Sequence, residues 1–525
     1  MIKLIGITLR AVVFRRIVMN LKLYFGFWGG TFLFVSNAIF AQGTIDPEWL
    51  IKRISPASNR EAQAWAVDVD DSGNVYWATN QVYPGQGLDV VLYKLDADSN
   101  EIWFSPTIYG GPFSQQSYIV KVVGDRAYIA GRDCPGLLSS CDMLIVAVDI
   151  FAGDTLWSTV WDQGYGYEEV DGIMVGDDGI YITGWTTGDT TGLDIALLKL
   201  DLNGNIIQTN TWGSNLHDHQ DGHAVMDDSV IYVAGLYECP YTFPDFRNDL
   251  DGKSLIAKFS RYNLSYLDHI VFGRNDPWQN RENAQGMISD GTFLYVVGVT
   301  TPSIGNWDIF VAKFDKNLNQ LWYNLWGGDY VEMGRAITIA DNGNIYVGCN
   351  TKSFGAGDQD VALLSYSPNG NFLGYQTWGG TEEDATRDIR ADGNYLYLTG
   401  ESKSLHLIND AAAYLMKVNI DSIVTSIHYD PLLSDFCLDQ NYPNPFNPAT
   451  TIEYNLSRAT HVTLRIYNLL GQEVRTLVDK VEQPGIYQTK WDGTNDTGLP
   501  VVSGVYVYQL YSDSGVQTRK MTLMQ

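Results

Sequence analysis

The stretch Arg335–Gly348, RAITIADNGNIYVG, decides the fold of this chain. It contains two short runs of alternating apolar residues on either side of the turn Asp341–Asn344, which is the pattern of a β-hairpin. A third apolar run follows at Asp360–Ser365, and a fourth ends at Trp378-Gly379-Gly380. The stretch and its continuation therefore predict one small antiparallel sheet of four strands.

This unit occurs seven times, and each copy has a tyrosine in its second strand. These anchor tyrosines are Tyr76, Tyr128, Tyr181, Tyr232, Tyr295, Tyr346 and Tyr397, spaced 51 to 63 residues apart. A four-stranded sheet cannot bury both faces alone, so a period near fifty indicates blades that pack radially around an axis. We therefore predict an all-β, seven-bladed β-propeller, with function on its loops and not in a conventional catalytic cleft.

The seventh repeat is incomplete, because no W-G-G strand follows Tyr414–Val418. At the other end of the chain, Glu48–Ile54 (EWLIKRI) precedes the first inner strand, where the other repeats have their W-G-G strand. We expect a strand at about residues 48–54 to complete the seventh blade. Such closure pairs the first strand with the last and removes two open sheet edges.

These lines resemble the seven-bladed β-propeller repeat of bacterial secreted proteins, which carries motifs such as DIFVAKF at Asp308–Phe314 and W-G-G at Trp326–Gly328. Two repeats depart from the pattern, with Lys253 and Ala412 where aspartate is usual. The resemblance covers about residues 46–425. It implies the fold, but the family has no general activity to transfer.

Composition limits the classes of partner. The chain has 525 residues, 13% aromatic and 18% charged, with 51 glycines and a formal net charge of −27. The glycine and aromatic content is typical of turn-rich β proteins. No run of basic residues offers a nucleic-acid surface, and an acidic protein attracts cations.

Residues 1–41 read as a secretory signal peptide. They contain five basic residues and no acid, and the apolar stretch Leu23–Phe40 leads to Ala41, after which we expect cleavage. Met19 is an alternative start, and a retained membrane anchor is an alternative role. No cysteine stands at the cleavage point to carry a lipid. Cleavage would change the net charge from −27 to −32, because the five basic residues are removed, and the mature protein would then have no membrane span.

The five cysteines cannot all pair with one another. Cys134 and Cys141 bracket a Pro-Gly turn and can close a short disulfide loop in an oxidising compartment. Cys239, Cys349 and Cys437 are expected to be single.

A different pattern begins near Phe436, after a linker at residues 426–436. Alternating strands separated by Gly, Asn and Pro turns predict an Ig-like sandwich of about ninety residues. The domain plan is therefore a signal peptide at 1–41, a propeller at 42–425, the linker, and this module at 437–525.

The module resembles the type A C-terminal sorting domain of the type IX secretion system, and it is also similar to flagellar hook-capping Ig-like modules. The motif residues are Asn441, Tyr442, Pro443, Asn444, Pro445, Phe446, Asn447, Pro448, Gly471, Trp491, Asp492, Gly493, Ser503, Gly504, Tyr506, Arg519 and Lys520. The resemblance implies export by that machinery to the surface of a Gram-negative bacterium. An ordinary C-terminal Ig-like domain is the alternative.

Acidic residues precede the predicted inner strands and are the first candidates for a site. They are Glu61, Glu168, Glu169, Asp218, Asp221, Glu282, Glu332, Glu383 and Asp384, while the second repeat has Gln115 and Gln116 instead. We expect these side chains to converge at one mouth of the central channel, where carboxylates can hold Ca²⁺ or a cationic ligand. The alternative is that they bind backbone amides of neighbouring loops and fix the register of the blades. No other cofactor is expected.

His217, His219 and His223 are the only local cluster of histidines. On a strand, His217 and His219 would face the same side, as in a metal-binding pair. A solvated loop is the alternative, because no fourth ligand accompanies them.

Two main hypotheses of function follow. The first is a secreted or cell-surface binding propeller whose ligand is a glycan or a protein. The second is a glycan-active hydrolase or lyase that uses loop carboxylates, although the sequence has no G-x-S-x-G, Walker loop or sialidase Asp-box. A purely structural role in the surface layer is a third.

Overall fold

The computed structural model describes residues 43–56, 62–84, 87–103, 105–111, 113–136, 140–164, 166–187, 192–239, 252–273, 282–303, 306–405, 411–423, 436–438, 441, 443–456, 460–468, 471–482, 485–512 and 515–524. These residues are nearly all in β-strands, with one short 3₁₀ turn, η2 (Ile420–Ser422). None of them belongs to a helix long and apolar enough to cross a membrane. The predicted signal segment and its cleavage point lie outside the described residues.

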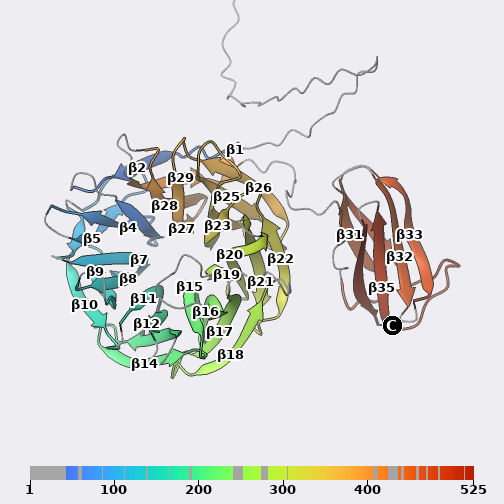
Figure 1. Ribbon diagram of the computed structural model, residues 1–525, viewed down its shortest axis with the longest axis horizontal. Helices are drawn as coiled ribbons and strands as arrows, with labels where there is room; N and C mark the ends of the chain where they lie inside the picture. Colours follow the sequence, from blue (N-terminus) through green and yellow to red (C-terminus); the bar gives the residue numbers. More distant parts are fainter. Residues whose placement is uncertain are drawn as a thin grey trace, which may run out of the picture. The chain divides into compact units, whose positions relative to one another are not determined.

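Seven antiparallel sheets surround a central axis in the first part of the chain, as Figure 1 shows. From the inner strand outward they are β3 (Gln63–Val69), β4 (Val75–Val82), β5 (Leu88–Leu95) and β6 (Thr107–Tyr109); β7 (Ser114–Val123), β8 (Arg126–Cys134), β9 (Asp142–Asp149) and β10 (Thr155–Trp161); β11 (Glu168–Gly176), β12 (Gly179–Thr187), β13 (Leu193–Leu200) and β14 (Ile206–Trp212); β15 (His217–Met226), β16 (Val230–Cys239), β17 (Lys253–Ser260) and β18 (Tyr266–Phe272); β19 (Glu282–Ser289), β20 (Phe293–Ser303), β21 (Asn306–Asp315) and β22 (Gln320–Trp326); β23 (Glu332–Ile339), β24 (Ile345–Thr351), β25 (Asp360–Tyr366) and β26 (Phe372–Trp378); and β27 (Asp384–Asp392), β28 (Tyr395–Ser402), β29 (Ala412–Asn419) and β2 (Trp49–Arg53). We number these blades one to seven in this order.

Apolar burial is concentrated between neighbouring blades. In the described part of the chain, seven clusters of buried side chains each join two adjacent sheets around the ring. The cluster between blades three and four, for example, packs Tyr181 and Leu197 against Val233 and Leu255. Burial against the next sheet is what a thin four-stranded sheet needs, since its two apolar faces would otherwise contact water. The predicted β-propeller is confirmed.

The structure shows why every repeat has a tyrosine in its second strand. All seven are at most 3% exposed, and several hydroxyls reach an acid in the hairpin turn before their own strand. Tyr181 donates to Asp178 at 2.7 Å and Tyr295 donates to Asp290 at 3.0 Å. Each such tyrosine therefore fills an inter-blade core with its ring and fixes a hairpin with its hydroxyl.

The ring closes through the N-terminal segment. Strand β2 pairs antiparallel with β29, with Trp49 opposite Lys417. Strand β1 (Gly43–Thr44) adds a fifth, parallel strand to the outer edge of blade six. Blades seven and one also share an apolar cluster, in which the indole of Trp77 donates to Thr399 Oγ1 at 2.7 Å.

A buried carboxylate ties three inner strands together. Asp68 of blade one, 2% exposed, lies 3.1 Å from the ammonium group of Lys121 on blade two and 3.0 Å from Arg390 on blade seven. It also accepts a hydrogen bond of 2.8 Å from the backbone amide of Val122. One side chain thus links the closure point of the ring to the blades on both sides.

The C-terminal module is a sandwich of two sheets. One contains β30 (Phe436–Leu438), β31 (Thr450–Leu456) and β34 (Gly485–Trp491), and the other contains β33 (Glu473–Glu482), β32 (Thr460–Asn468), β35 (Gly504–Ser512) and β36 (Gly515–Leu523). A single buried cluster with Trp491 at its centre fills the space between them. The Ig-like sandwich predicted from the sequence is confirmed.

Candidate functional site

A β-bulge interrupts the inner strand of every blade. The pairing of each inner strand with its neighbour skips one residue at one point, except in blade four, where a first shift skips Asp218 and a second skips three residues. At the shared point of irregularity the skipped residues are Trp65, Tyr118, Asp171, Asp221 to His223, Gln285, Arg335 and Arg387. Bulges bend a strand locally and redirect a side chain. We call Trp65, Tyr118, Asp171, Asp221, Gln285, Arg335 and Arg387 the channel ring.

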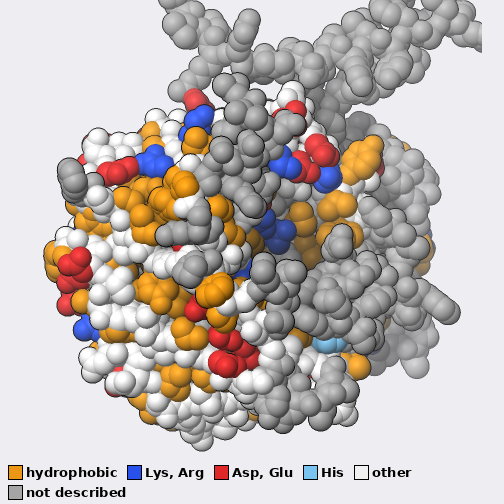
Figure 2. All heavy atoms as spheres, turned by 60° about the vertical axis from the view of Figure 1, so that its left-hand side comes forward, with side chains coloured by type: hydrophobic (Ala, Val, Ile, Leu, Met, Phe, Trp, Pro, Cys, Tyr) orange, Lys and Arg blue, Asp and Glu red, His pale blue; other side chains and the backbone are white. Residues whose placement is uncertain are grey.

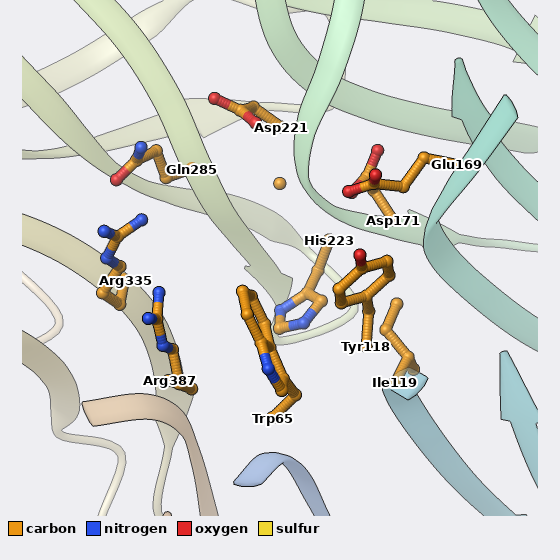
Figure 3. Close-up of a pocket in the computed structure, with 11 residues that line it drawn as sticks. Trp65, Tyr118, Ile119, Glu169, Asp171, Asp221, His223, Gln285, Arg335 and Arg387 are labelled. Carbon is orange, nitrogen blue, oxygen red and sulfur yellow. The ribbon is translucent and has the colours of Figure 1, made fainter. Parts of the chain in front are cut away.

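The channel ring surrounds a cavity on the axis of the propeller. The cavity measures about 240 Å³, and Ile119, Glu169, Gly222 and His223 complete its lining. Figure 3 shows the polar ends of the two arginines and of the aspartates directed toward the same open space from different blades. This cavity is the candidate functional site.

Opposite charges occupy opposite sides of the cavity. Arg335 and Arg387 come from the neighbouring blades six and seven, and Asp171 and Asp221 come from blades three and four. Figure 3 shows the arginines on the left, Asp171 with Glu169 across the open space on the right, and Asp221 at the top. Trp65 provides an aromatic wall between them and meets Tyr118 edge-on, with ring centroids 5.0 Å apart.

The two arginines differ in their partners. Arg387 forms an ion pair with Glu401 and lies 4.3 Å above the ring of Trp65. Arg335 has no carboxylate partner among the described residues; it contacts Met333 Sδ at 3.3 Å, and its Nε has no partner. Burial, together with the charge of Arg387, lowers the pKa of Arg335 to about 10. Arg335 therefore remains a cation at neutral pH and is directed at the cavity, and the charges of Asp221 and Glu401 favour its charged form.

The carboxylates on the other side are crowded. Burial raises the pKa of Asp171 well above its usual value, and the neighbouring Glu169 and Asp221 add to the shift. Asp171 Oδ2 has no hydrogen-bond partner among the described residues, whereas Asp221 accepts a hydrogen bond from Asn283. This wall of the cavity would gain from a nearby positive charge, because a cation relieves the repulsion between the acids.

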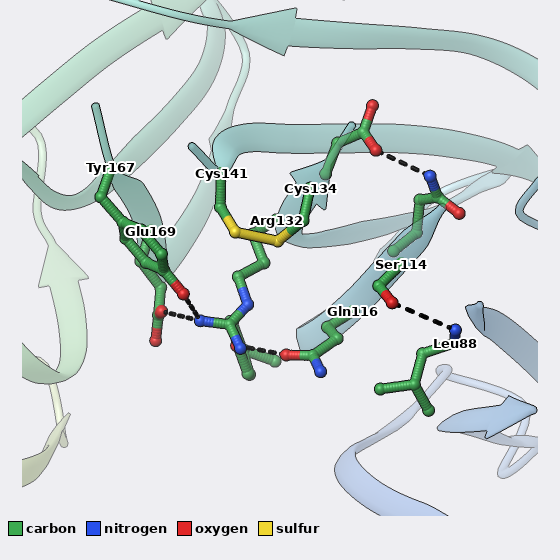
Figure 4. The surroundings of a disulfide bond; sticks show 11 residues. Leu88, Ser114, Gln116, Arg132, Cys134, Cys141, Tyr167 and Glu169 are labelled. Atoms are coloured by element: carbon green, nitrogen blue, oxygen red, sulfur yellow. Dashed lines mark hydrogen bonds and ion pairs between the residues drawn. A yellow bond between two sulfur atoms is a disulfide. The ribbon is translucent and has the colours of Figure 1, made fainter. Parts of the chain in front are cut away.

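Arg132 binds the third acid of the cavity, Glu169. Its guanidinium lies 2.9 Å from Glu169 and contacts the hydroxyl of Tyr167. Figure 4 shows this arginine next to the Cys134–Cys141 disulfide, which was predicted from the sequence and closes the end of blade two. Arg132 thus forms an ion pair with Glu169, whereas Asp171 and Asp221 form none in the described part of the chain.

The nine acids proposed from the sequence have different fates. Glu169 and Asp221 line the cavity. Five others are at most 3% exposed and lie where each inner strand begins: Glu168, Asp218, Glu282, Glu332 and Asp384. Glu383 forms an ion pair with Lys403, and Glu61 lies outside the described residues. The expected ring of carboxylates at one mouth is therefore replaced by a ring of mixed chemistry.

The buried acids bind loops, as in the alternative considered for them. Glu332 accepts hydrogen bonds from the amide of Gly328 at 2.9 Å and the hydroxyl of Thr351 at 3.1 Å. Asp384 accepts from the amide of Gly380 at 2.7 Å and from Ser402. In each case the amide belongs to the W-G-G segment of the preceding blade and the hydroxyl to the acid's own blade. These carboxylates fix how one blade follows another.

Blade two replaces the corresponding acid by Gln115, which is buried and donates to Asp133 at 2.7 Å. The next residue, Gln116, accepts a hydrogen bond of 2.8 Å from the hydroxyl of Tyr118. These amides serve the local structure beside the channel ring.

The histidine cluster belongs to strand β15 and not to a solvated loop. His217 and His219 are 9% and 5% exposed, and His217 Nδ1 accepts a hydrogen bond of 3.1 Å from the amide of Leu193. His223 lies in the wide bulge of blade four and lines the cavity. The bulge separates His223 from the other two, so the cluster in the sequence is not a cluster in space.

Three carboxylates come together between blades two and three. Ligand oxygens of Asp142, Asp162 and Glu168 lie within 4.8 Å of one another. Burial raises the pKa of Glu168 to about 7, and the charges of Asp142 and Asp162 contribute. Asp162 follows Trp161 at a position where other blades have the first glycine of W-G-G. These oxygens are of the kind that Ca²⁺ prefers.

The motif residues of the C-terminal module mostly build its fold. Asn441 donates to the carbonyl of Pro443 at 3.1 Å and to Thr450 at 2.9 Å. Phe446 is 1% exposed and contacts Trp491, with ring centroids 5.6 Å apart. Further members bind locally: Asp492 pairs with Arg475, Tyr506 donates to Val502, and Arg519 donates to Leu438. Tyr442 lies outside the described residues.

Only part of the chain matches a known family. Residues 447–515 match the FlgD Ig-like domain family. No curated protein matches the chain.

Several solved structures resemble it at low identity. One is PorZ of Porphyromonas gingivalis, described as an essential bacterial surface component of the type IX secretion system, with 13% identity and a TM-score of 0.39 over 90% of this chain and 60% of PorZ. An inactive virginiamycin B lyase from Staphylococcus aureus has 12% identity and a TM-score of 0.42, over 70% and 99%. The Pan2 WD40 domain of Neurospora crassa has 12% identity and a TM-score of 0.41, over 71% and 97%. The chain thus spans less than two thirds of PorZ.

Proposed function

We propose that this chain is a secreted or cell-surface binding propeller, and that its glycan or protein ligand contacts the central cavity. The chemistry of the channel ring carries the proposal. In a repeat protein, positions that serve the fold recur from repeat to repeat, as the anchor tyrosines and the buried acids do. The seven bulged positions instead hold Trp, Tyr, Asp, Asp, Gln, Arg and Arg. Such divergence at one structural position is what a binding surface requires.

We further propose export by the type IX secretion system through residues 437–525. The NYPNPFNP motif, the Ig-like sandwich and the exposed Lys520 near the end of the last strand support this. Removal of residues 437–525 should leave the propeller inside the cell envelope of a bacterium that carries this system, while the full chain reaches the surface or medium. Equal export of both forms would refute the sorting role.

The binding proposal is tested with the full mature chain on glycan arrays and on surface-protein libraries. The double variant Asp221→Asn with Arg335→Gln removes charge from both sides of the cavity, and Lys352→Gln on an exposed loop is the matched control. We expect a ligand that the parent and the control bind and the double variant does not. Equal binding by all three proteins would place the ligand elsewhere and refute the proposal.

An enzyme is the second candidate, and one observation favours it. Asp171, with its raised pKa, stands beside Asp221. A carboxyl group with a raised pKa beside a second carboxylate can act as a general acid. Release of reducing ends from a glycan by the parent, abolished in Asp171→Asn or in Asp221→Asn, would establish a hydrolase and displace the binding-only view.

A further inference from the structure

We propose that the channel cavity binds a small zwitterion of the size of a dipeptide, with its carboxylate on Arg335 and Arg387 and its ammonium group facing Asp171 and Asp221. The inference rests on the proposed binding function and specifies the chemistry of the ligand at that site.

The arginine side of the cavity requires an anion. Arg335 is half-buried and forms no ion pair among the described residues, and Nε of both Arg335 and Arg387 lacks a hydrogen-bond partner there. A guanidinium that has lost part of its hydration gains from an anionic hydrogen-bond partner. A carboxylate matches the planar fork of arginine donors in geometry and in charge. The free carboxylate of a ligand would therefore supply the missing partner.

The aspartate side requires a cation. Asp171 and Asp221 form no ion pair in the described part of the chain, although basic side chains neutralise the nearby Glu169 and Glu401. Two adjacent carboxylates repel each other unless a positive charge or a proton lies close to them. An ammonium group is a compact cation with three donors, which suits two acids on neighbouring blades.

The charges of the cavity act on one another only across a distance. None of the ion pairs between described residues joins Arg335 or Arg387 to Asp171 or Asp221. Figure 3 shows the two groups separated by open space, with Trp65 at one flank. A ligand with a single charge would satisfy one side only. A ligand with a charge at each end satisfies both.

The cavity has room for a ligand of this kind. Its volume of about 240 Å³ is partly open to solvent and admits a small molecule with a charged group at each end. Gln285, whose Oε1 has no hydrogen-bond partner among the described residues, offers an acceptor for an amide between the two charged ends.

Isothermal titration of the full mature chain with three probes tests the inference. The probes are alanyl-alanine, its N-acetyl form without the cation, and its C-terminal amide without the anion. We expect one site per chain for alanyl-alanine and an affinity at least tenfold weaker for each capped form. These three measurements need no substitution, so they do not depend on whether a variant folds.

Variants then assign each end of the ligand. Arg335→Gln should weaken alanyl-alanine at least tenfold but leave the affinity for the amide unchanged, because the amide lacks the group that Arg335 binds. Asp221→Asn should likewise weaken alanyl-alanine at least tenfold but leave the affinity for the N-acetyl form unchanged, because that form lacks the ammonium group that Asp221 faces. Arg335→Lys, which keeps the charge, should recover part of the affinity, and Arg126→Gln on the far hairpin of blade two should bind like the parent.

Three results would overturn the inference. The first is equal affinity for the free and capped dipeptides, and the second is parent-like binding by both channel variants. The third is a glycan or protein ligand that needs the channel ring while alanyl-alanine does not bind, which would leave the proposed function intact. If no ligand of any class depends on the channel ring, the inference and the proposed function fail together.

Discussion

Asp68→Asn should destabilise the propeller at the point where its ring closes. The substitution keeps the shape of the side chain and an oxygen that can still accept from Val122, but it removes the charge that faces Lys121 and Arg390. Asp68 is 2% exposed, whereas the side chains of Lys121 and Arg390 are 35% and 29% exposed. Water therefore screens one end of each ion pair.

The magnitude follows from these contacts. A hydrogen bond to a charged group contributes about 1.5–3 kcal/mol to the free energy of unfolding. Partial exposure of one partner brings the contribution of an ion pair toward the lower end of that range. Two weakened pairs give a loss of about 2–4 kcal/mol in the free energy of unfolding. Asp68→Ala, which also leaves the amide of Val122 unpaired, should cost about 1 kcal/mol more.

Urea unfolding of the full mature chain, followed by tryptophan fluorescence, measures this loss. Asp71→Asn is the matched control, because Asp71 is an exposed acid in the hairpin turn that follows the strand of Asp68. We expect the control to change stability by less than about 0.5 kcal/mol. If Asp68→Asn unfolds at the same urea concentration as the control, the ion pairs do not hold the closure and the reasoning is refuted.

Three further predictions concern closure, burial and packing. Deletion of residues 46–54 should lower the melting temperature measured by circular dichroism, because the seventh blade loses its outer strand; an unchanged temperature would contradict this. Glu168→Gln should gain stability over the parent as pH rises from 5 to 8, since a carboxyl with a raised folded-state pKa stabilises only while protonated and loses that contribution on ionising near pH 7; a difference in urea midpoint that does not vary with pH would count against it. Gly110→Ala should cost about 1–3 kcal/mol, because its Cβ would overlap the carboxylate of Asp89, whereas the neighbouring Gly111→Ala has open space; equal unfolding midpoints would disprove the difference.

The sequence was sufficient for the architecture because the residues that build it recur. The anchor tyrosines and the hairpin turns repeat in nearly every blade, and each repeat displays the alternation of a strand. Closure of the ring could also be predicted from the repeats. The seventh repeat lacks its fourth strand, and Trp49–Arg53 forms a strand that lies before the first repeat.

The functional cavity could not be located in the same way. Acids such as Glu332 mark where each inner strand begins, but their side chains are occupied by loop amides. The channel residue lies three positions further on, as Arg335 does after Glu332. A bulge adds one residue to the strand and reverses which side chains face the channel. The alternation of apolar and polar residues does not show where the bulge lies, so it does not predict which side chains face the channel. Comparison of the seven repeats does show that the residue type at the position of Arg335 varies from blade to blade.

The pairing of β2 with β29 also sets the timing of folding. The register that places Trp49 opposite Lys417 joins the second strand of the chain, β2, to the last strand of the propeller, β29. A polypeptide that crosses a membrane from its N-terminus must deliver nearly four hundred residues before this contact can form. Until then β2 has no strand to pair with, and the sheet edges at both ends of the incomplete ring can bind chaperones or other chains. The ring can therefore close only when both ends of the propeller sequence are present.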